Sequence, residues 1–149
     1  MEVRLTKRFR FEMAHALLGH DGPCRNIHGH SYELDVCLKG KPRNESGHPK
    51  DGMVMDFSDL SAIVHTCILA DFDHALVIHT DAPVPSSDTE PFGKVVRLPI
   101  QPTCENLVLR FSERLRQHLP ETVQLYQLRL RETSSSWCDW FLSDNTLSS

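Results

Sequence analysis

The sequence predicts an α+β fold in which two helices cover one face of an antiparallel four-stranded sheet. Two alternating segments open the chain, two segments of helical periodicity follow, and two further alternating segments close it. The predicted order is strand, strand, helix, helix, strand, strand. Because the strands are separated from a helical block, the helices are expected on one side of the sheet. The length of 149 residues and the 40% of hydrophobic residues suit a single domain, 1–149.

Two strands open the chain. Apolar and polar side chains alternate over residues 3–14, and the alternation resumes from about Ile27 to Leu38, after the turn-rich stretch GHDGPCRN. On the second strand, His28, His30 and Tyr32 share a face with the apolar residues that follow. The next segment, 40–52, is rich in Gly, Pro and charge and is expected to be a surface loop. It leads to the short apolar segment MVMDF, where a hairpin-like return is expected.

The hydrophobic period changes at Ser58. Apolar residues at 60, 63, 64, 67 and 68 follow helical spacing, with Asp56 or Ser58 as the N-cap. A Pro-rich segment, 81–93, and the short β-prone segment KVVRLPI come next. A second helix is expected to open at Thr103 and to stop at Pro120. Residues 122–132 and 136–142 alternate weakly and are predicted to be the two closing strands.

Composition excludes several functional classes. A formal net charge of -4 without a basic run argues against nucleic-acid binding. The first residues alternate instead of forming an apolar signal peptide, and no apolar run approaches the length of a membrane span. Five cysteines without a CxxC pair indicate reduced thiols. We therefore expect a cytoplasmic protein that binds neither nucleic acid nor membranes.

The strongest local signal for chemistry is His28-Gly29-His30. Two histidines at i and i+2 of a strand project from one face and can bind one metal ion. His15 ends the first predicted strand, and an antiparallel neighbour could bring it opposite the pair. Three neutral imidazoles leave one tetrahedral position open, as in a catalytic zinc site. The alternative is a solvent-exposed pair that binds no metal.

Cys24 lies four residues before His28, in a loop that contains Gly and Pro. A thiolate can act as a base or nucleophile, and a nearby zinc ion or protonated histidine lowers the pKa of a thiol. Cys24 can therefore be reactive or merely structural. The remaining cysteines are expected to be inert structural thiols: Cys37, Cys67, Cys104 and Cys138.

Asp73-His74 and Glu132 can also take part in chemistry. Asp73 could orient or charge-stabilise His74; otherwise the pair is a capping Asp beside a surface His. Glu132 ends the segment QLRLRET, and we expect it to face away from the core. There it is either a surface carboxylate or a pocket group that accepts two N–H donors from a guanidine-like ring edge.

Six motifs, in order along nearly the whole chain, resemble those of the 6-pyruvoyltetrahydropterin synthase family. They are Ala14-His15, Cys24 before His28-Gly29-His30, GMVMDFSDL from Gly52 to Leu60, Asp73-His74, PTCENL from Pro102 to Leu107, and Glu132-Thr133. The resemblance implies the tunnelling fold, whose monomers assemble into rings with active sites at subunit interfaces. For this chain it implies a homo-oligomer, expected to be a hexamer.

The resemblance also implies an activity and a set of site residues. The implied substrate is a pterin triphosphate, 7,8-dihydroneopterin triphosphate, and the implied cofactor is Zn²⁺. The implied roles are zinc binding by His15, His28 and His30, catalysis by Cys24, Asp73 and His74, and substrate binding by Glu132, Thr103 and Glu105.

The spacing CxxxHGHS that starts at Cys24 resembles the 6-carboxytetrahydropterin synthases of the queuosine pathway. The pyruvoyl-forming enzymes of tetrahydrobiopterin synthesis usually carry a longer gap, so the carboxy-forming branch is favoured. The chain departs from the family pattern at Trp140, near a common Tyr, and in a long loop between His79 and Gln101. A pyruvoyl-forming synthase, a non-catalytic metal-binding relative and a zinc hydrolase remain alternatives.

Overall fold

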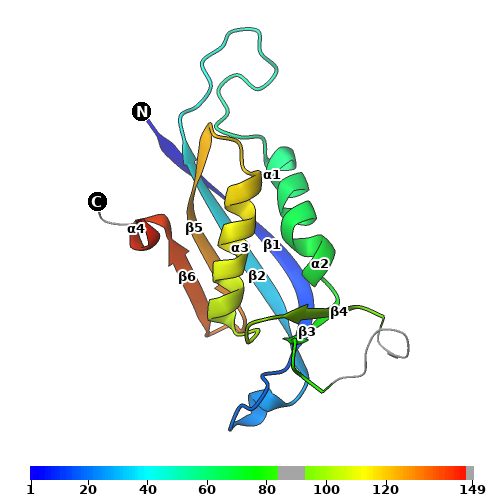
Figure 1. The fold of residues 1–149 in the computed structure, drawn as a ribbon. Helices are drawn as coiled ribbons and strands as arrows, with labels where there is room; N and C mark the ends of the chain where they lie inside the picture. The colour runs from blue at the N-terminus through cyan, green and yellow to red at the C-terminus, as the bar shows by residue number, and fades with distance from the viewer. Residues whose placement is uncertain (84–92, 147–149) are drawn as a thin grey trace.

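The computed structural model describes residues 1–83 and 93–146, which form one sheet with helices on one face (Figure 1). The strands are β1 (Val3–His15), β2 (His28–Gly40), β3 (Ala75–His79), β4 (Val95–Leu98), β5 (Val123–Arg131) and β6 (Trp137–Phe141). The helices are α1 (Phe57–Val64), α2 (Ala70–Phe72), α3 (Cys104–His118) and α4 (Leu142–Asn145), with a 3₁₀ turn at Pro23–Arg25 and a π-helical segment at His65–Leu69. No helix in these two ranges is long and apolar enough to cross a membrane.

The sheet has the order β4-β3-β1-β2-β5-β6. Strands β1, β2, β5 and β6 pair antiparallel, whereas β3 runs parallel to β1 and β4 runs parallel to β3. The α+β class is confirmed, but the predicted four-stranded antiparallel sheet and the order ββααββ are wrong. The sheet is mixed, and two strands lie between the first and second helical blocks.

The two additional strands give little signal in the sequence. Strand β3 reads ALVIH, and its first four residues are buried. A short strand with both faces covered shows a continuous apolar run instead of alternation, so periodicity does not separate it from a buried helix end. Strand β4 lies within the β-prone segment KVVRLPI, which the predicted order does not count as a strand.

The remaining predicted elements agree closely with the structure. Strands β1, β2, β5 and β6 and helix α3 occupy the predicted segments, and the first predicted helix spans α1, the π-helical segment and α2. Asp56 is the N-cap of α1, since its side chain accepts a hydrogen bond from the Ser58 backbone N–H at 2.7 Å. The segment MVMDF contains no strand. Residues 84–92 of the predicted Pro-rich loop lie outside the described residues.

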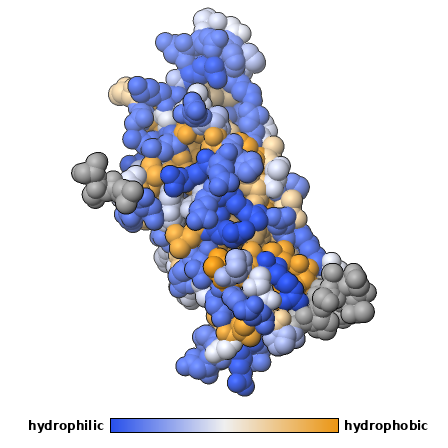
Figure 2. All heavy atoms as spheres, viewed as in Figure 1, coloured by the Kyte–Doolittle hydropathy of each residue, from blue (hydrophilic) through white to orange (hydrophobic). Residues whose placement is uncertain are grey.

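The hydrophobic core lies between the helices and one face of the sheet, which we call the helix-covered face; the other is the open face. Phe11 of β1 stacks on Tyr32 of β2 with ring centroids 5.2 Å apart, and Phe111 of α3 packs against Phe11 and Phe72. The outer surfaces of the helices are largely hydrophilic, with apolar side chains gathered between them (Figure 2). The helices therefore bury their apolar stripes against the sheet.

A bulge in β5 changes which side chains face the core. Opposite Cys37 and Leu38, strand β5 supplies an extra residue, Tyr126, so the alternation shifts by one position. The buried residues of β5 are odd-numbered before the bulge and even-numbered after it: Val123, Leu125, Leu128 and Leu130.

Candidate metal centre and active site

Three histidines meet on the helix-covered face where β1 ends and β2 begins. The antiparallel register places His15 directly opposite His28, and His30 lies two residues farther along the same face of β2. Their ligand nitrogens all lie within 4.8 Å of one another. The three side chains that the sequence predicts as metal ligands are therefore brought together by the pairing of two strands.

Backbone carbonyls fix the orientation of two of these rings. His15 Nδ1 lies 2.8 Å from the Pro102 carbonyl oxygen, and His28 Nδ1 lies 2.8 Å from the Asn26 carbonyl oxygen. Because a carbonyl oxygen only accepts hydrogen bonds, each Nδ1 carries the proton in the neutral ring and each Nε2 presents a lone pair. This orientation by a second partner is typical of histidines that bind metals.

The two lone pairs make the cluster suitable for a cation. His15 Nε2 and His28 Nε2 are only 3.1 Å apart, so two neutral rings in these tautomers repel each other unless a positive charge lies between or beside them. His15 is almost fully buried, and burial lowers its pKa, so a proton on this ring is disfavoured as that charge. Three imidazole nitrogens are a donor set that Zn²⁺ accepts, so the residues fit the implied metal.

Glu132 lies beside the histidine cluster, on the helix-covered face. Its Oε1 is 3.6 Å from His15 Nε2 and 3.8 Å from His30 Nε2, and it accepts a hydrogen bond from the Tyr32 hydroxyl at 3.0 Å. The expectation that Glu132 faces away from the core is therefore wrong. Glu132 lies two residues after Leu130 and four after Leu128, all beyond the bulge at Tyr126, so it shares their face of the sheet. The alternation of these residues already carried that signal.

Tyr32 is a site residue that sequence reasoning missed. It is fully buried, and burial, followed by the negative charge of Glu132, raises its pKa, so its hydroxyl remains a hydrogen-bond donor. Its position two residues after His30 on the same face was the available signal. Tyr32 holds one oxygen of Glu132 in place and leaves the other carboxylate oxygen for a ligand.

One cavity gathers most of the predicted site. It has a volume of about 610 Å³ and lies beside the histidine cluster, with Cys24 on its wall. Cys24 is half-buried and sits in the 3₁₀ turn Pro23–Arg25. All predicted site residues except Asp73 and His74 line this cavity: His15, Cys24, His28, His30, Thr103, Glu105 and Glu132.

The first turn of α3 forms another wall of this cavity. Thr103 caps the helix, since its hydroxyl accepts a hydrogen bond from the Asn106 backbone N–H at 3.3 Å. Glu105 is exposed in the first turn, where the partial positive charge of the helix N-terminus stabilises a carboxylate. Seven further residues line the cavity without having been predicted as site residues: Leu17, His20, Cys104, Thr133, Ser136, Trp137 and Cys138.

Asp73 and His74 lie elsewhere. They follow α2, and Asp73 Oδ1 lies 2.9 Å from His74 Nδ1 while it also accepts a hydrogen bond from the Glu12 backbone N–H at 3.0 Å. The backbone of His74 has a φ of 57°, which is uncommon for a residue other than glycine, and its side chain is 76% exposed. Asp73 therefore orients His74, as the sequence suggests, but neither residue reaches Cys24 within this chain.

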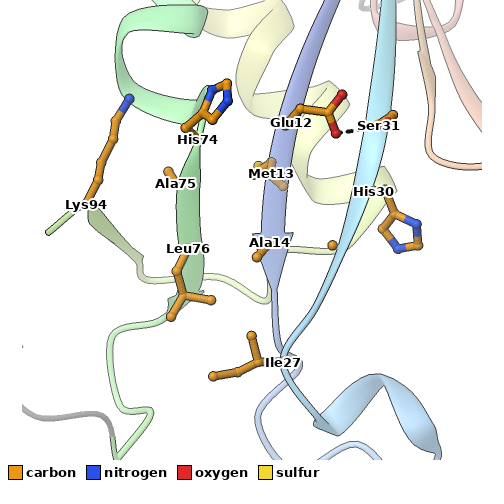
Figure 3. A pocket seen from close by; sticks show the side chains of 11 residues that line it. Glu12, Met13, Ala14, Ile27, His30, Ser31, His74, Ala75, Leu76 and Lys94 are labelled. Atoms are coloured by element: carbon orange, nitrogen blue, oxygen red, sulfur yellow. Dashed lines mark hydrogen bonds between the residues drawn. The ribbon is translucent and has the colours of Figure 1, made fainter. Parts of the chain in front are cut away.

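His74 instead lines a second cavity of about 500 Å³ on the open face (Figure 3). Its other walls include Lys94, Ile27 and the hydrogen-bonded pair Glu12 and Ser31, which is joined at 2.7 Å. The two cavities share only His30 among the described residues that line them. The catalytic set expected from the sequence is thus divided between two faces of the sheet.

Comparisons with known proteins agree with these motifs. A family model described as 6-pyruvoyl tetrahydropterin synthase matches residues 4–141. The 6-carboxy-5,6,7,8-tetrahydropterin synthase of Haemophilus influenzae is 34% identical over 92% of this chain and 97% of its own length. The dihydroneopterin monophosphate aldolase of Pyrococcus furiosus is 31% identical over 89% of this chain and 91% of its own.

A solved structure shows the same fold. The crystal structure of 6-pyruvoyl tetrahydropterin synthase from Plasmodium vivax matches with a TM-score of 0.73 at 20% identity, and the match covers 94% of this chain and 97% of that one. The helix-covered mixed sheet is therefore a fold that this enzyme shares. Since the family model and a relative of 34% identity both extend over nearly the whole chain, the protein belongs to the 6-pyruvoyl tetrahydropterin synthase family of pterin-processing lyases.

Proposed function

We propose that this protein converts 7,8-dihydroneopterin triphosphate, with uptake of water, into 6-carboxy-5,6,7,8-tetrahydropterin, acetaldehyde and triphosphate, as a step in queuosine synthesis. The observation that carries the proposal is the cavity that gathers the three histidines, Cys24 and Glu132. The similarity to a 6-carboxy-5,6,7,8-tetrahydropterin synthase supports the carboxy-forming branch.

His15, His28 and His30 would hold a zinc ion through their ring nitrogens. When bound, zinc supplies Lewis acidity toward the hydroxyl groups of the substrate side chain. Glu132, held at one oxygen by the Tyr32 hydroxyl, binds the N–H edge of the pterin ring. Thr103 and Glu105, at the start of α3, complete the wall against which the ring lies.

Cys24 and His74 transfer protons to and from the substrate. The Cys24 thiolate, at Sγ, takes the proton from the substrate carbon next to a side-chain hydroxyl. His74 is held at Nδ1 by Asp73, so its Nε2 is the nitrogen that exchanges protons during the later steps. Because His74 lies on the opposite face from Cys24, we propose that a neighbouring subunit supplies it, within a homo-oligomeric ring expected to be a hexamer.

The alternative within the family is a pyruvoyl-forming synthase, which would use the same residues and retain all carbons of the side chain. The similarity to a dihydroneopterin monophosphate aldolase adds the monophosphate as a substrate to compare. These reactions differ in whether a carbon–carbon bond breaks and in which phosphate ester is accepted. Release of phosphate alone does not distinguish the two triphosphate reactions.

The deciding experiment is product analysis with purified, zinc-loaded protein. The triphosphate and the monophosphate are incubated separately, the pterin product is identified by mass spectrometry, and acetaldehyde is measured directly. The proposal expects 6-carboxytetrahydropterin and acetaldehyde from the triphosphate. A product with a three-carbon side chain and no acetaldehyde would place the protein in the pyruvoyl-forming branch, and faster turnover of the monophosphate would make it an aldolase.

A further inference from the structure

We infer that Gln101 is a positioning residue that sets the place of Cys24 relative to the three histidines. The inference rests on the proposed function, in which Cys24 is the base. It concerns the Cys24 loop, residues 16–27, which links β1 to β2 and has no regular structure apart from the short 3₁₀ turn.

The side chain of Gln101 forms two hydrogen bonds with the backbone of this loop at Leu18. Gln101 Oε1 accepts the Leu18 N–H at 3.0 Å, and Gln101 Nε2 donates to the Leu18 carbonyl oxygen at 2.5 Å. A carboxamide offers a donor and an acceptor side by side, so it pairs with one residue's backbone much as a neighbouring strand would. Neither a carboxylate nor an aliphatic side chain provides both groups.

A further backbone hydrogen bond connects this part of the loop to Cys24. The backbone N–H of Leu17, the neighbour of Leu18, donates to the Cys24 carbonyl oxygen at 3.0 Å. The path from Gln101 to the reactive cysteine thus consists of two hydrogen-bonded contacts joined by one peptide unit. Moving Leu18 moves the residue to which Cys24 is tied.

On its other side, Gln101 is fixed to the part of the protein that holds the metal site. Its carbonyl oxygen accepts a hydrogen bond from Asn106 Nδ2 in α3 at 2.9 Å, and the next residue, Pro102, provides the carbonyl that orients His15. Helix α3 is itself anchored in the core by Leu107 and Phe111. One short segment therefore fixes both the base-bearing loop and a metal ligand.

The loop has few other attachments. Its remaining hydrogen bonds in the described part of the chain stay within the loop or reach His28 at its end, for example Gly22 N–H to His20 Nδ1 at 2.8 Å and Asn26 N–H to the Pro23 carbonyl oxygen at 3.0 Å. Among the described residues, Gln101 is thus the distant side chain that bonds this loop. Without it, the distance between Cys24 and the histidines would vary.

The test compares Gln101→Ala and Gln101→Glu with the wild type. Displacing a base by about an ångström can lower a rate by as much as about 100-fold, so kcat of Gln101→Ala should fall by about 10- to 100-fold. KM should stay within about threefold, because Glu132 and the metal ligands are unchanged. Gln101→Glu keeps the acceptor for the Leu18 N–H but places a second carboxylate oxygen against the Leu18 carbonyl oxygen, so kcat of this variant should also fall.

Two readouts do not need turnover. In Gln101→Ala, amide hydrogen exchange at Leu18 should become at least about tenfold faster, because its hydrogen-bond acceptor is gone. Alkylation of Cys24 by iodoacetamide, followed by peptide mass spectrometry, should speed up while alkylation of buried Cys67 does not. Zinc content and cooperative thermal unfolding should match the wild type.

Gln127→Ala is the matched control, since Gln127 also makes a side-chain hydrogen bond, to Asp139 at 3.2 Å, but on the surface and outside the cavity. The inference is overturned if Gln101→Ala resembles Gln127→Ala in kcat and in Leu18 exchange, or if it loses zinc or cooperative unfolding. If the wild type makes no product while amide exchange at Leu18 still depends on Gln101, the proposed function is wrong. The inference that Gln101 positions the Cys24 loop is then still supported.

Discussion

At the scale of single residues, two side chains of the candidate metal centre are held by backbone atoms. The carbonyls of Pro102 and Asn26 orient His15 and His28, and a side-chain substitution at either position leaves the carbonyl in place. In contrast, replacing a histidine of the candidate metal centre removes the ring nitrogen that would bind the metal. The site should therefore respond very differently to changes in a ligand and in its neighbour.

His28→Ala or His30→Ala should lose zinc and activity together. Two imidazoles remain in either variant, and removing even an outer partner of a ligand costs about 10- to 100-fold in metal affinity, so removing a ligand should cost more. Zinc per chain, measured by elemental analysis after dialysis, and turnover are the readouts. Two control variants, Asn26→Ala and the distant His118→Ala, should both keep zinc. Full zinc occupancy in His28→Ala would show that His28 is not a metal ligand.

Cys24→Ala separates catalysis from binding. Loss of a positioned base typically lowers a rate by about 10²- to 10⁴-fold, so turnover should fall by that much while zinc content and pterin affinity stay near the wild type. Stopped-time product assays and pterin titration measure the two effects. Turnover like that of the wild type would contradict the assigned role.

Cys67→Ala is the matched cysteine control. Cys67 is buried in the π-helical segment, far in sequence from the cavity residues, and burial raises the pKa of its thiol. Its loss should lower the free energy of unfolding by about 1 kcal/mol, as expected for a small buried side chain, and leave kcat unchanged. Chemical denaturation gives the first quantity.

At the scale of elements, α1 depends on its N-cap. Hydrogen bonds from the Ser58 side chain and then from its backbone N–H lower the pKa of Asp56 below its ordinary value. A carboxyl group with a lowered pKa in the folded state stabilises the protein at pH values above its unfolded pKa, about 3.9, and loses this contribution as pH falls through the folded value. The cap should therefore act at neutral pH and fade in acid.

Asp56→Ala should accordingly lower Tm at pH 7, and the difference from the wild type should shrink as the pH is lowered below about 4. Thermal unfolding of metal-free protein, followed by circular dichroism, avoids interference from the loss of zinc in acid. Asp56→Asn keeps an uncharged cap and should retain most of the stability at pH 7. A gap between Asp56→Ala and wild type that does not change with pH would show that the charge has no part in it.

At the scale of the whole molecule, the two cavities lie on opposite faces of one sheet. Cys24 and the histidines line one, and His74 lines the other, with His30 common to both linings. A single chain therefore holds two incomplete parts of the proposed catalytic set. An assembly in which the cavity of one subunit meets His74 of the next would complete it.

Mixing two inactive variants tests this arrangement. In a ring whose sites each combine Cys24 of one subunit with His74 of the next, random co-assembly of Cys24→Ala and His74→Ala chains should restore about a quarter of wild-type activity. The two variants are denatured, mixed in equal amounts, refolded with zinc and assayed, with each variant refolded alone as the control. No recovery in refolded, oligomeric mixtures would mean that each site uses one subunit only.

The sequence alone determined the features that depend on local periodicity. Alternation along residues 27–38 put His28 and His30 on one face, the helical spacing after Thr103 defined α3, and the ordered motifs indicated the family. These predictions succeeded because the direction of a side chain within a strand or helix follows from its immediate neighbours. Two of the candidate zinc ligands, His28 and His30, could be named for the same reason, whereas His15 joins them through the pairing of β1 with β2.

Only the tertiary structure decided the features that depend on pairing between distant segments. The bulge at Tyr126 reverses the alternation midway along β5, and β3, buried against β1, makes the sheet mixed and carries His74 away from Cys24. Gln101, which is unremarkable in the sequence, reaches across to Leu18. Periodicity reports which face a residue takes within its own element, whereas register shifts, parallel neighbours and long-range hydrogen bonds arise only when elements meet.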